Sequence, residues 1–498
     1  MVANFEAGHP RAECDDFARS FVPTDQRQRN WHRAIVGVFV GVAHASCQGL
    51  DQDLAFLGIR DLDLFNAPVG TNLAKHRSSA LHDDPFSQCV RISATDTENV
   101  PAKRNEQQSN RPRCPFGGLN GFVHRVPNRY RAGMAEDITV VKTSRQPEDL
   151  RRLLQAWIQE TTGDQAATVG PVSSPDANGM SSESLFFDAS WDGRAASLVA
   201  RLAPSPDDVP AFMTYDLKRQ YDLIELVGRR SSVPVPELLW LETDPTSLGV
   251  PFFIMHRVKG RVPSDLPPYS IDGWVRDLTP DARAQLVTNS LSVLAGVHSI
   301  DIADGSADFL EFDSSLGDTP LRRHFADQQL YYRWMCDGAG RSFPAIERAF
   351  AWIEANWPDE QPSAISWGDS RIGNIMYEPH GVAPVAVLDW EMAAIAPPAL
   401  DVGWMCFMHR FFEYLLGLGG MDTLPDMLQP AQARETYGEM TGVDVGDLRF
   451  ELAYSATRHA IIMSRLHARN VHFGTHEWPE EPDDAFLFKG LLAELTAD

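Results

Sequence analysis

The sequence lacks three features that would each have suggested a class of protein. It has no apolar run approaching the ~20 residues of a membrane span. The longest apolar stretch, AIVGVFVGVAHA at 34–45, is too short, and it lies too far from the N-terminus for a standard signal peptide. The six cysteines form no CxxC pair, so neither a zinc site nor a disulfide framework is indicated. These absences predict a cytoplasmic protein with no membrane partner.

The sequence also has too little positive charge for a nucleic-acid partner. It contains 44 Lys and Arg against 68 Asp and Glu, a formal net charge of −24. Binding to a phosphate backbone needs a basic surface, so we expect no nucleic acid to bind. An acidic surface is compatible with a cationic substrate, but more often it simply keeps a protein soluble. The charge alone therefore does not choose a substrate.

The first 133 residues differ in composition from the rest of the chain. They carry 16 basic and 14 acidic residues, against 28 and 54 in the remainder, and show little helical or strand periodicity. The character changes at Met134, and helical patterning follows from Pro147. We favour a misassigned start, with the natural protein beginning at Met134. The alternative is a poorly structured extension that regulates the protein or binds a partner.

Residues 178–260 have the pattern of a small antiparallel sheet with one helix. The strands SLFFDASW and SLVARLA flank a turn at Asp192–Gly193, and the amphipathic segment TYDLKRQYDLIELVG follows. VPVPELLWLETD and SLGVPFFIMHRVKG predict two further strands. Arg201 lies inside the second strand, so we expect an anionic partner, either a structural carboxylate or a nucleotide phosphate. The Gly/Ser turn before the first strand can fold over phosphates.

Two short apolar runs in the second half of the chain end in carboxylates. ISWGDSRIGNIMY at 365–377 places Asp369 five residues before Asn374, and AVLDWE then places Asp389 after another apolar run. Asp, Asn and Gly are common turn residues. Carboxylate and carboxamide oxygens are also the ligands that hold Mg²⁺ against a nucleotide. Taken alone, these residues leave both interpretations open.

The order of these parts resembles the aminoglycoside phosphotransferase/choline kinase-type family of small-molecule kinases, relatives of the protein kinases. A Gly/Ser loop, a strand cation, a helix, VPVP and PFFIM precede GDxxxxN and DWE. The chain is most similar to actinobacterial proteins assigned as aminoglycoside phosphotransferases and to the kinase domain fused to some acyl-CoA dehydrogenases. The resemblance implies a bilobal, protein-kinase-like α+β fold. It predicts a small antiparallel-sheet N-lobe at 134–258 and a larger, mostly helical C-lobe with the catalytic and substrate sites at 259–498.

The resemblance also implies a role for each matching residue. Asp369 is expected to orient the acceptor hydroxyl and receive its proton, and Asn374 and Asp389 to hold Mg²⁺. Arg371 and Glu391 are expected near the metal as accessory residues. Gln220 and Asp401 are expected to give structural support. The residues expected to bind the nucleotide are Gly179, Ser181, Ser182, Arg201, Met255, His256, Arg257 and Val258.

Three positions depart from the usual pattern of the family. Arg201 stands where a kinase usually carries Lys, and the two are not interchangeable at a phosphate site. Gln220 stands where an acid would pair with that cation, although Asp216, one helical turn earlier, is a substitute. Ser366-Trp367 replaces the His-Gly of many relatives. These departures put aminoglycoside resistance in doubt and leave a weak kinase or a nucleotide-binding pseudokinase as alternatives.

The resemblance implies Mg²⁺-dependent transfer of phosphate from ATP, or alternatively GTP, to a hydroxyl of a small molecule. The acceptor is expected between the C-lobe helices and the Asp369 loop. Those helices have few clustered acids, so a hydroxyacyl-CoA-type acceptor is a rival to an aminoglycoside-like one. The sequence does not indicate the oligomeric state. Aromatic residues expected to line the acceptor pocket are Trp334, Trp404, Phe407, Phe411 and Phe412, and histidines expected to be structural are His298, His324, His409 and His459.

Overall fold

The computed structural model describes residues 146–174, 183–205, 208–265, 267–359 and 362–497. The expectations for residues 1–133, for a start at Met134 and for the Gly/Ser loop with Gly179, Ser181 and Ser182 lie outside these residues.

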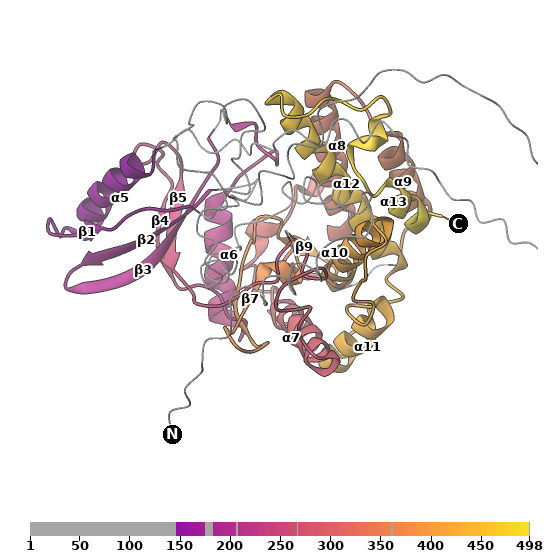
Figure 1. The fold of residues 1–498 in the computed structure, drawn as a ribbon, viewed down its shortest axis with the longest axis horizontal. Helices are drawn as coiled ribbons and strands as arrows, with labels where there is room; N and C mark the ends of the chain where they lie inside the picture. Colours follow the sequence, from indigo (N-terminus) through magenta and orange to yellow (C-terminus); the bar gives the residue numbers. More distant parts are fainter. Residues whose placement is uncertain (1–145, 175–182, 206–207, 266, 360–361, 498) are drawn as a thin grey trace, which may run out of the picture. The chain divides into compact units, whose positions relative to one another are not determined.

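The described chain opens with helix α5 (Pro147–Thr162) and a five-stranded antiparallel sheet in the order β1-β2-β3-β5-β4 (Figure 1). The turn between β2 and β3 contains Asp192 and Gly193, whose φ angles are 48° and 72°. Two consecutive left-handed residues suit a tight hairpin, which is why Asp-Gly fits there. The strands are β1 (Thr168–Val169), β2 (Glu183–Trp191), β3 (Arg194–Leu202), β4 (Leu238–Glu242) and β5 (Phe252–His256).

Helix α6 (Leu217–Arg230) packs on β4 and β5. It begins after Asp216, whose carboxylate accepts a hydrogen bond of 2.9 Å from the backbone N–H of Arg219. That contact is an N-cap, which satisfies one of the unpaired donors at the start of a helix. The expectation that Asp216 substitutes as the partner of Arg201 is therefore wrong. Gln220 lies on the buried face of this helix.

The segment after β5 is tied to the helical region by backbone hydrogen bonds. The N–H groups of Arg261 and Tyr377 each donate to the other residue's carbonyl, at 2.9 and 2.7 Å. Gly260 lies so close to this pair that a Cβ there would be 2.6 Å from the Tyr377 oxygen. The chain can make this approach only because residue 260 has no side chain.

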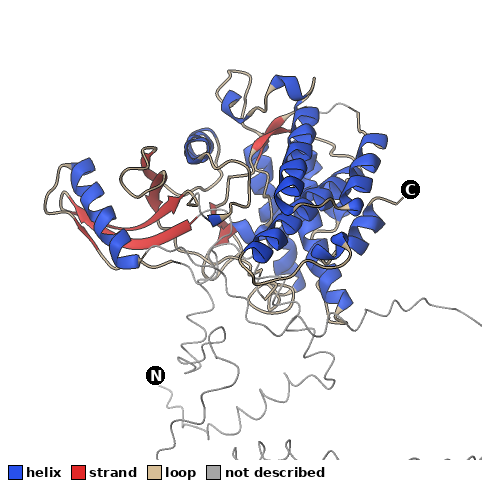
Figure 2. Ribbon diagram, turned by 90° about the horizontal axis from the view of Figure 1, so that it is seen from above, coloured by secondary structure: helices blue, strands red, loops and turns tan. Residues whose placement is uncertain are grey.

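The rest of the described chain is mainly helical, with two small two-stranded sheets, β6-β9 and β7-β8 (Figure 2). Helices α10 and α12 pack against each other and are buried along most of their length. α10 is apolar on nearly every side, whereas α12 also buries charged residues such as Glu451 and Arg458. The helices are α7 (Pro280–His298), α8 (Pro320–Ala339), α9 (Pro344–Ala355), α10 (Pro398–Leu418), α11 (Pro430–Thr441), α12 (Arg449–His472) and α13 (Lys489–Leu495). The short strands are β6 (Ala364–Ser366), β7 (Ile375–Tyr377), β8 (Pro384–Val387) and β9 (Ala394–Ala396), and the 3-10 turns are η3 (Asp308–Leu310), η4 (Ser314–Leu316), η5 (Ile372–Asn374) and η6 (Pro482–Ala485).

This arrangement, an antiparallel sheet with helices followed by a larger helical region, confirms the predicted bilobal α+β fold. The sheet contains the strands expected from SLFFDASW, SLVARLA and PFFIM, and the region that follows is mostly helical, as expected. Within the described residues, no helix combines the length and hydropathy needed to cross a bilayer.

Candidate active site

A cavity of about 110 Å³ lies where the sheet meets the β7-β8 segment. The described residues expected at the nucleotide and metal sites line it: Arg201, Met255, His256, Arg257, Val258, Asn374 and Asp389. Gln220, expected as structural support, lines it as well. Apolar side chains complete its wall, among them Phe186, Val199, Ile224, Phe253, Met376 and Leu388. The structure thus gathers residues that are up to 188 positions apart in the sequence.

Asp369 follows β6 in a tight loop. The loop turns at Gly368, whose φ is 88° and where a Cβ would lie 2.1 Å from the carbonyl oxygen of Met392. Only glycine fits this combination of a left-handed backbone and close packing. Asp369 itself is 4% exposed. The loop therefore fixes the backbone of this aspartate before any side-chain contact is made.

Three donors hold the Asp369 carboxylate. Trp404 Nε1, from α10, donates to Oδ1 at 2.9 Å. Asn374 Nδ2 donates to Oδ2 at 2.7 Å, and Arg371 Nε lies 3.3 Å from the same oxygen. Hydrogen bonds to a carboxylate are charge-assisted and strong, so they fix its orientation.

Asn374 connects Asp369 to the cavity. Its amide nitrogen also donates to the Asp369 backbone carbonyl at 3.0 Å. With the amide nitrogen committed to Asp369, the carboxamide oxygen is the atom that remains for a ligand in the cavity that Asn374 lines. This is the orientation that a metal-binding asparagine requires.

Asp389 and Arg201 form a buried ion pair. Arg201 Nη2 lies 2.7 Å from Asp389 Oδ1 and 3.6 Å from Glu391 Oε2, and its Nη1 lies 3.3 Å from Ser184 Oγ. The partner expected for the strand cation is thus a carboxylate, and it is the one expected to hold metal. Asp389 has a left-handed backbone with a φ of 55°. Trp367 Nε1 donates to the Asp389 carbonyl at 3.1 Å, which helps to hold this unusual conformation.

The residues present fit a magnesium ion shared with a nucleotide. The described residues contain no group of three or more His, Cys, Asp and Glu that would hold a metal alone. Asn374 and Asp389 instead offer hard oxygens beside one cavity. Mg²⁺ is commonly bound by one or two carboxylates, with phosphates and water supplying the other ligands. The site suits a metal that arrives with phosphates.

Asp401, at the start of α10, braces the Asp369 loop. Its carboxylate accepts hydrogen bonds from Ser366 Oγ, from the backbone N–H groups of Trp367 and Gly368, and from His298 Nε2, at 2.7 to 3.0 Å. Burial acts to raise the pKa of Asp401, but these donors, His298 first, hold it below its usual value. The contacts are those expected of a supporting residue.

Sequence reasoning missed two partners of the Asp369 loop. One is Asp265, which forms a buried ion pair with Arg371 Nη1. Burial acts to lower the pKa of Arg371, but Asp265, Asp369 and Asp389 raise it, so the residue stays charged. The other is the indole N–H of Trp404, which was expected only as an apolar wall. No local pattern in the sequence marks either partner.

The aromatic residues of α10 do not form the expected pocket wall. Phe407, Phe411 and Phe412 are fully buried and pack in the core, where Phe407 and Phe411 surround His459. The expectation that they line an acceptor pocket is therefore wrong. Of the aromatic residues named from the sequence, Trp334 on α8 is only partly buried.

Comparison with known proteins decides the family. Residues 175–434 match the profile of a family described as "Phosphotransferase enzyme family", which is more than half of the chain. The chain belongs to this phosphotransferase family. The match confirms the expected enzyme class, a phosphotransferase of the small-molecule kinase type.

The curated relatives are longer proteins. The chain is 27% identical over 282 residues to acyl-CoA dehydrogenase family member 10 of Mus musculus, covering 55% of this chain and 24% of the relative. It is 28% identical over 269 residues to acyl-CoA dehydrogenase family member 11 of Homo sapiens, covering 53% and 32%. The chain thus spans about a quarter to a third of these relatives, which confirms the expected likeness to acyl-CoA dehydrogenase fusions. Among solved structures, an aminoglycoside phosphotransferase assigned by similarity, from Ralstonia eutropha, matches with 23% identity and a TM-score of 0.48, covering 69% of this chain and 96% of that one.

In this phosphotransferase, part of the expected adenine-binding segment is already in use. The backbone N–H of His256 donates to Glu237 O at 2.8 Å, and that of Arg257 donates to Ser197 O at 2.9 Å. The Arg257 guanidinium lies over the Phe186 ring, 4.8 Å from its centre. Met255 is also paired within the sheet, with Val199 of β3 and Leu238 of β4, so the backbone groups of this segment are largely used by the fold.

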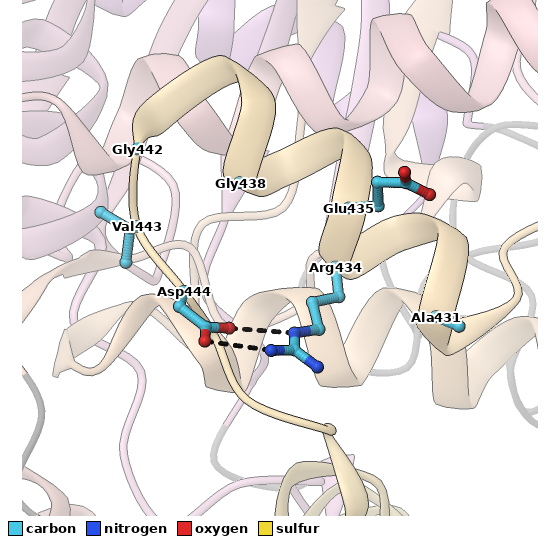
Figure 3. Close-up of a pocket in the computed structure, with 7 residues that line it drawn as sticks. All are labelled: Ala431, Arg434, Glu435, Gly438, Gly442, Val443 and Asp444. Carbon is cyan, nitrogen blue, oxygen red and sulfur yellow. Dashed lines mark hydrogen bonds and ion pairs between the residues drawn. The ribbon is translucent and has the colours of Figure 1, made fainter.

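A second hollow lies on α11 and the loop that follows it (Figure 3). Arg434 and Asp444 face each other across it, and their two hydrogen bonds measure 2.9 and 3.0 Å. Both side chains are exposed, and pairs of this kind usually contribute little to stability. No residue of the phosphotransferase site lines this hollow, and we assign it no function.

Proposed function

We propose that the protein transfers the γ-phosphoryl group of ATP to a hydroxyl of a small molecule, with Mg²⁺ as cofactor. One observation carries the proposal. Asn374 is hydrogen-bonded to Asp369 and lines the same cavity as Asp389, so the groups for proton transfer and for metal binding meet at one place. Phosphoryl transfer needs little more than positioning and charge neutralisation, which this arrangement offers.

In this mechanism Asp369 orients the acceptor hydroxyl and takes its proton. The donors from Trp404, Asn374 and Arg371 hold the carboxylate in one orientation, so little reorganisation is needed when the hydroxyl arrives. Asn374 and Asp389 would hold Mg²⁺, which neutralises charge on the nucleotide phosphates when it is bound. Arg201 lies 2.7 Å from Asp389, so its guanidinium would also contact the nucleotide phosphates.

The adenine would lie between the apolar walls of the cavity. Phe186, Val199 and Ile224 on the sheet side face Met376 and Leu388 on the other side of the lining. Apolar walls with few polar groups are typical of nucleotide pockets. These walls accept either purine, so GTP is an alternative donor.

A hydroxyacyl thioester is a second candidate for the acceptor. The observation that favours it is the likeness to two acyl-CoA dehydrogenase family members. A kinase that works together with an acyl-CoA dehydrogenase would encounter hydroxyacyl thioesters as substrates. An aminoglycoside-like or other hydroxylated metabolite is the broader alternative. A pseudokinase that binds nucleotide without transfer is the remaining one, and Gln220 at the position of the usual acid is what favours it.

The test of the proposal is Asp369→Asn in the full chain. Asn has the size of Asp but is a far weaker proton acceptor, so we expect ATP binding to remain and transfer to fall by about 10²- to 10⁴-fold. ADP release should be measured over a panel containing an aminoglycoside, hydroxy acids and hydroxyacyl thioesters. Asp444→Asn, which changes an exposed ion pair, is the matched control and should behave as the wild type. Turnover near the wild-type rate in Asp369→Asn would remove its assigned role.

A further inference from the structure

Helix α12 carries a buried cation that the proposed transfer of phosphate does not use. Arg458 is 4% exposed, and its Nε atom is buried without a hydrogen-bond partner. Within the described residues its nitrogens donate no hydrogen bond, and no carboxylate forms an ion pair with it. Burying a cation without a partner is costly, and unpaired buried charges are rare outside functional sites. Arg465 on the same helix differs, because its Nε and Nη2 both donate to Pro210 O.

Arg458 is one side chain away from the proposed catalytic aspartate. Its guanidinium carbon lies 4.8 Å from the centre of the Trp404 indole ring. The same indole donates its N–H to Asp369 Oδ1 at 2.9 Å. A group held by Arg458 at the ring face would therefore belong to a molecule that reaches Asp369 at the ring edge.

The acidic groups around Arg458 act on its pKa without forming an ion pair with its guanidinium. Burial acts to lower its pKa, while Tyr454, Asp401, Asp369 and Asp327 act to raise it. Asp401 and Asp369 are already held by the donors described above. Burial raises the pKa of Asp327 to about 6 in spite of Arg458 and Arg219, so that carboxylate is itself poorly paired.

Further cations lie on the same side of α12. Arg465 and Arg469 follow Arg458 by seven and eleven residues, a spacing that puts all three on one helical face. Arg465 lies over the partly buried Trp334, 4.3 Å from the centre of its ring. The guanidinium of Arg465 is committed to Pro210 O, so among these cations Arg458 is the one proposed to contact the acceptor.

We propose that Arg458 binds a carboxylate of the acceptor, and that the acceptor is a hydroxy acid; this substrate class rests on the proposed function. The planar guanidinium fork matches a carboxylate in two parallel hydrogen bonds. The Trp404 ring supports the guanidinium from one side and orients Asp369 through its N–H. The hydroxyl to be phosphorylated is the one that reaches Asp369 when the carboxylate lies on Arg458.

Two readouts in the full chain test the inference. The first is thermal unfolding with 2-, 3- and 4-hydroxybutyrate and with their uncharged amides. The second is ADP release with ATP and the same compounds. The variants are Arg458→Met, which keeps an unbranched side chain over Trp404, and Arg458→Lys; Arg465→Met is the control on the same helix.

We expect at least one hydroxybutyrate to stabilise the wild type more than its amide does, and to be the better acceptor by roughly 10- to 100-fold in kcat/KM. Arg458→Met should lose both preferences, Arg458→Lys should recover part of them, and Arg465→Met should keep them. ATP binding should be unchanged in all three variants.

The outcomes separate this inference from the proposed function. If the wild type prefers the hydroxy acid in thermal unfolding through Arg458 but releases no ADP, the binding site stands and the proposed transfer fails. If amides or hydroxyacyl thioesters are phosphorylated as well by Arg458→Met as by the wild type, transfer stands and Arg458 is only a packing residue. If no hydroxy acid stabilises the wild type beyond its amide, the inference is overturned.

Discussion

At the scale of single residues, the carboxylates of the site are each held by neighbouring donors or cations. The Asp369 carboxylate receives hydrogen bonds from Trp404, Asn374 and Arg371. The Asp389 carboxylate is paired with Arg201, and the Asp401 carboxylate with the Asp369 loop and His298. Each carboxylate is therefore oriented before a ligand binds, which is the form of preorganisation that phosphoryl transfer rewards.

The contribution of Trp404 is testable with Trp404→Phe. Phe keeps an aromatic ring in the core but removes the N–H that donates to Asp369. A hydrogen bond to a charged group is worth about 1.5–3 kcal/mol, so we expect kcat to fall roughly 10- to 100-fold with little change in ATP affinity. Steady-state kinetics and ATP titration measure the two effects.

Trp352→Phe is the matched control, because the indole N–H of Trp352 is buried and has no hydrogen-bond partner among the residues that the structure describes. It removes the same atom from a site where nothing accepts its hydrogen. Equal losses of kcat in the two variants would show that the Trp404 hydrogen bond is not what matters.

For Arg201, the sequence predicted that an anionic partner is needed but did not identify that partner. Its position in a strand predicted an anionic partner, and the structure supplies one in Asp389. The substitute partner predicted from the sequence, Asp216, is wrong because that side chain caps α6. Partners 188 residues apart leave no trace in local periodicity, so the sequence could indicate the need for a partner but not its identity.

At the scale of elements, α12 joins an apolar core to several buried charges. Glu451, in its first turn, lies against α10, where a Cβ at Gly403 would be 2.3 Å from the Glu451 Cβ. Burial raises the pKa of Glu451 from its usual 4.5 to about 7. The folded protein therefore binds a proton at this residue more tightly than the unfolded chain does.

This shift predicts a loss of stability as the pH rises. Because the pKa of Glu451 is higher in the folded protein than in the unfolded chain, protonation of Glu451 favours the folded state. This contribution to the free energy of unfolding is complete below about pH 4.5 and is lost as the pH rises through about 7. The shift corresponds to roughly 3 kcal/mol. Gln cannot ionise, so Glu451→Gln should gain stability relative to the wild type by about that amount between pH 4.5 and 8.

Urea unfolding at several pH values measures this difference. Glu435→Gln, at an exposed position on α11, is the control and should follow the wild type at every pH. A difference between Glu451→Gln and the wild type that does not change with pH would contradict the assignment.

The elements themselves were largely predictable, because their signals are local. The Asp-Gly turn with alternating strands predicted the β2-β3 hairpin, and the amphipathic segment TYDLKRQYDLIELVG corresponds to α6. Helix α8 was not singled out, although its buried residues follow a helical spacing: Leu321, His324, Phe325, Tyr331, Tyr332 and Met335. The packing of α10 was also misjudged, because periodicity does not separate a core face from a pocket wall.

At the scale of the whole molecule, the proposed site forms only when the sheet and the helical region come together. Arg201 is contributed by β3, Asn374 and Asp389 by the segments around β7 and β8, and Trp404 by α10. The order of motifs predicted which residues meet, and family membership supports the reaction class. Without a ligand, Arg201 offsets part of the charge of Asp389 and Glu391, so a metal bound alone would compete with a guanidinium. A metal that arrives with phosphates gives Arg201 new anionic partners.

The central claim is that Asn374 and Asp389 form a working site for magnesium and nucleotide. Thermal unfolding of the full chain, with and without ATP and with and without Mg²⁺, tests it most directly. The comparison is between the wild type and Asp389→Ala, with Asp444→Ala as the surface control. Because Asp389→Ala also leaves Arg201 without its nearest partner, the ligand-induced shift must be compared, not the starting stability.

For the wild type, we predict that ATP with Mg²⁺ at ~100 times the dissociation constant raises the free energy of unfolding by about 2.7 kcal/mol. ATP alone should give much less, and Asp389→Ala should lose the part that depends on Mg²⁺. No shift with any combination, or an unchanged Mg²⁺-dependent shift in Asp389→Ala, would contradict the account.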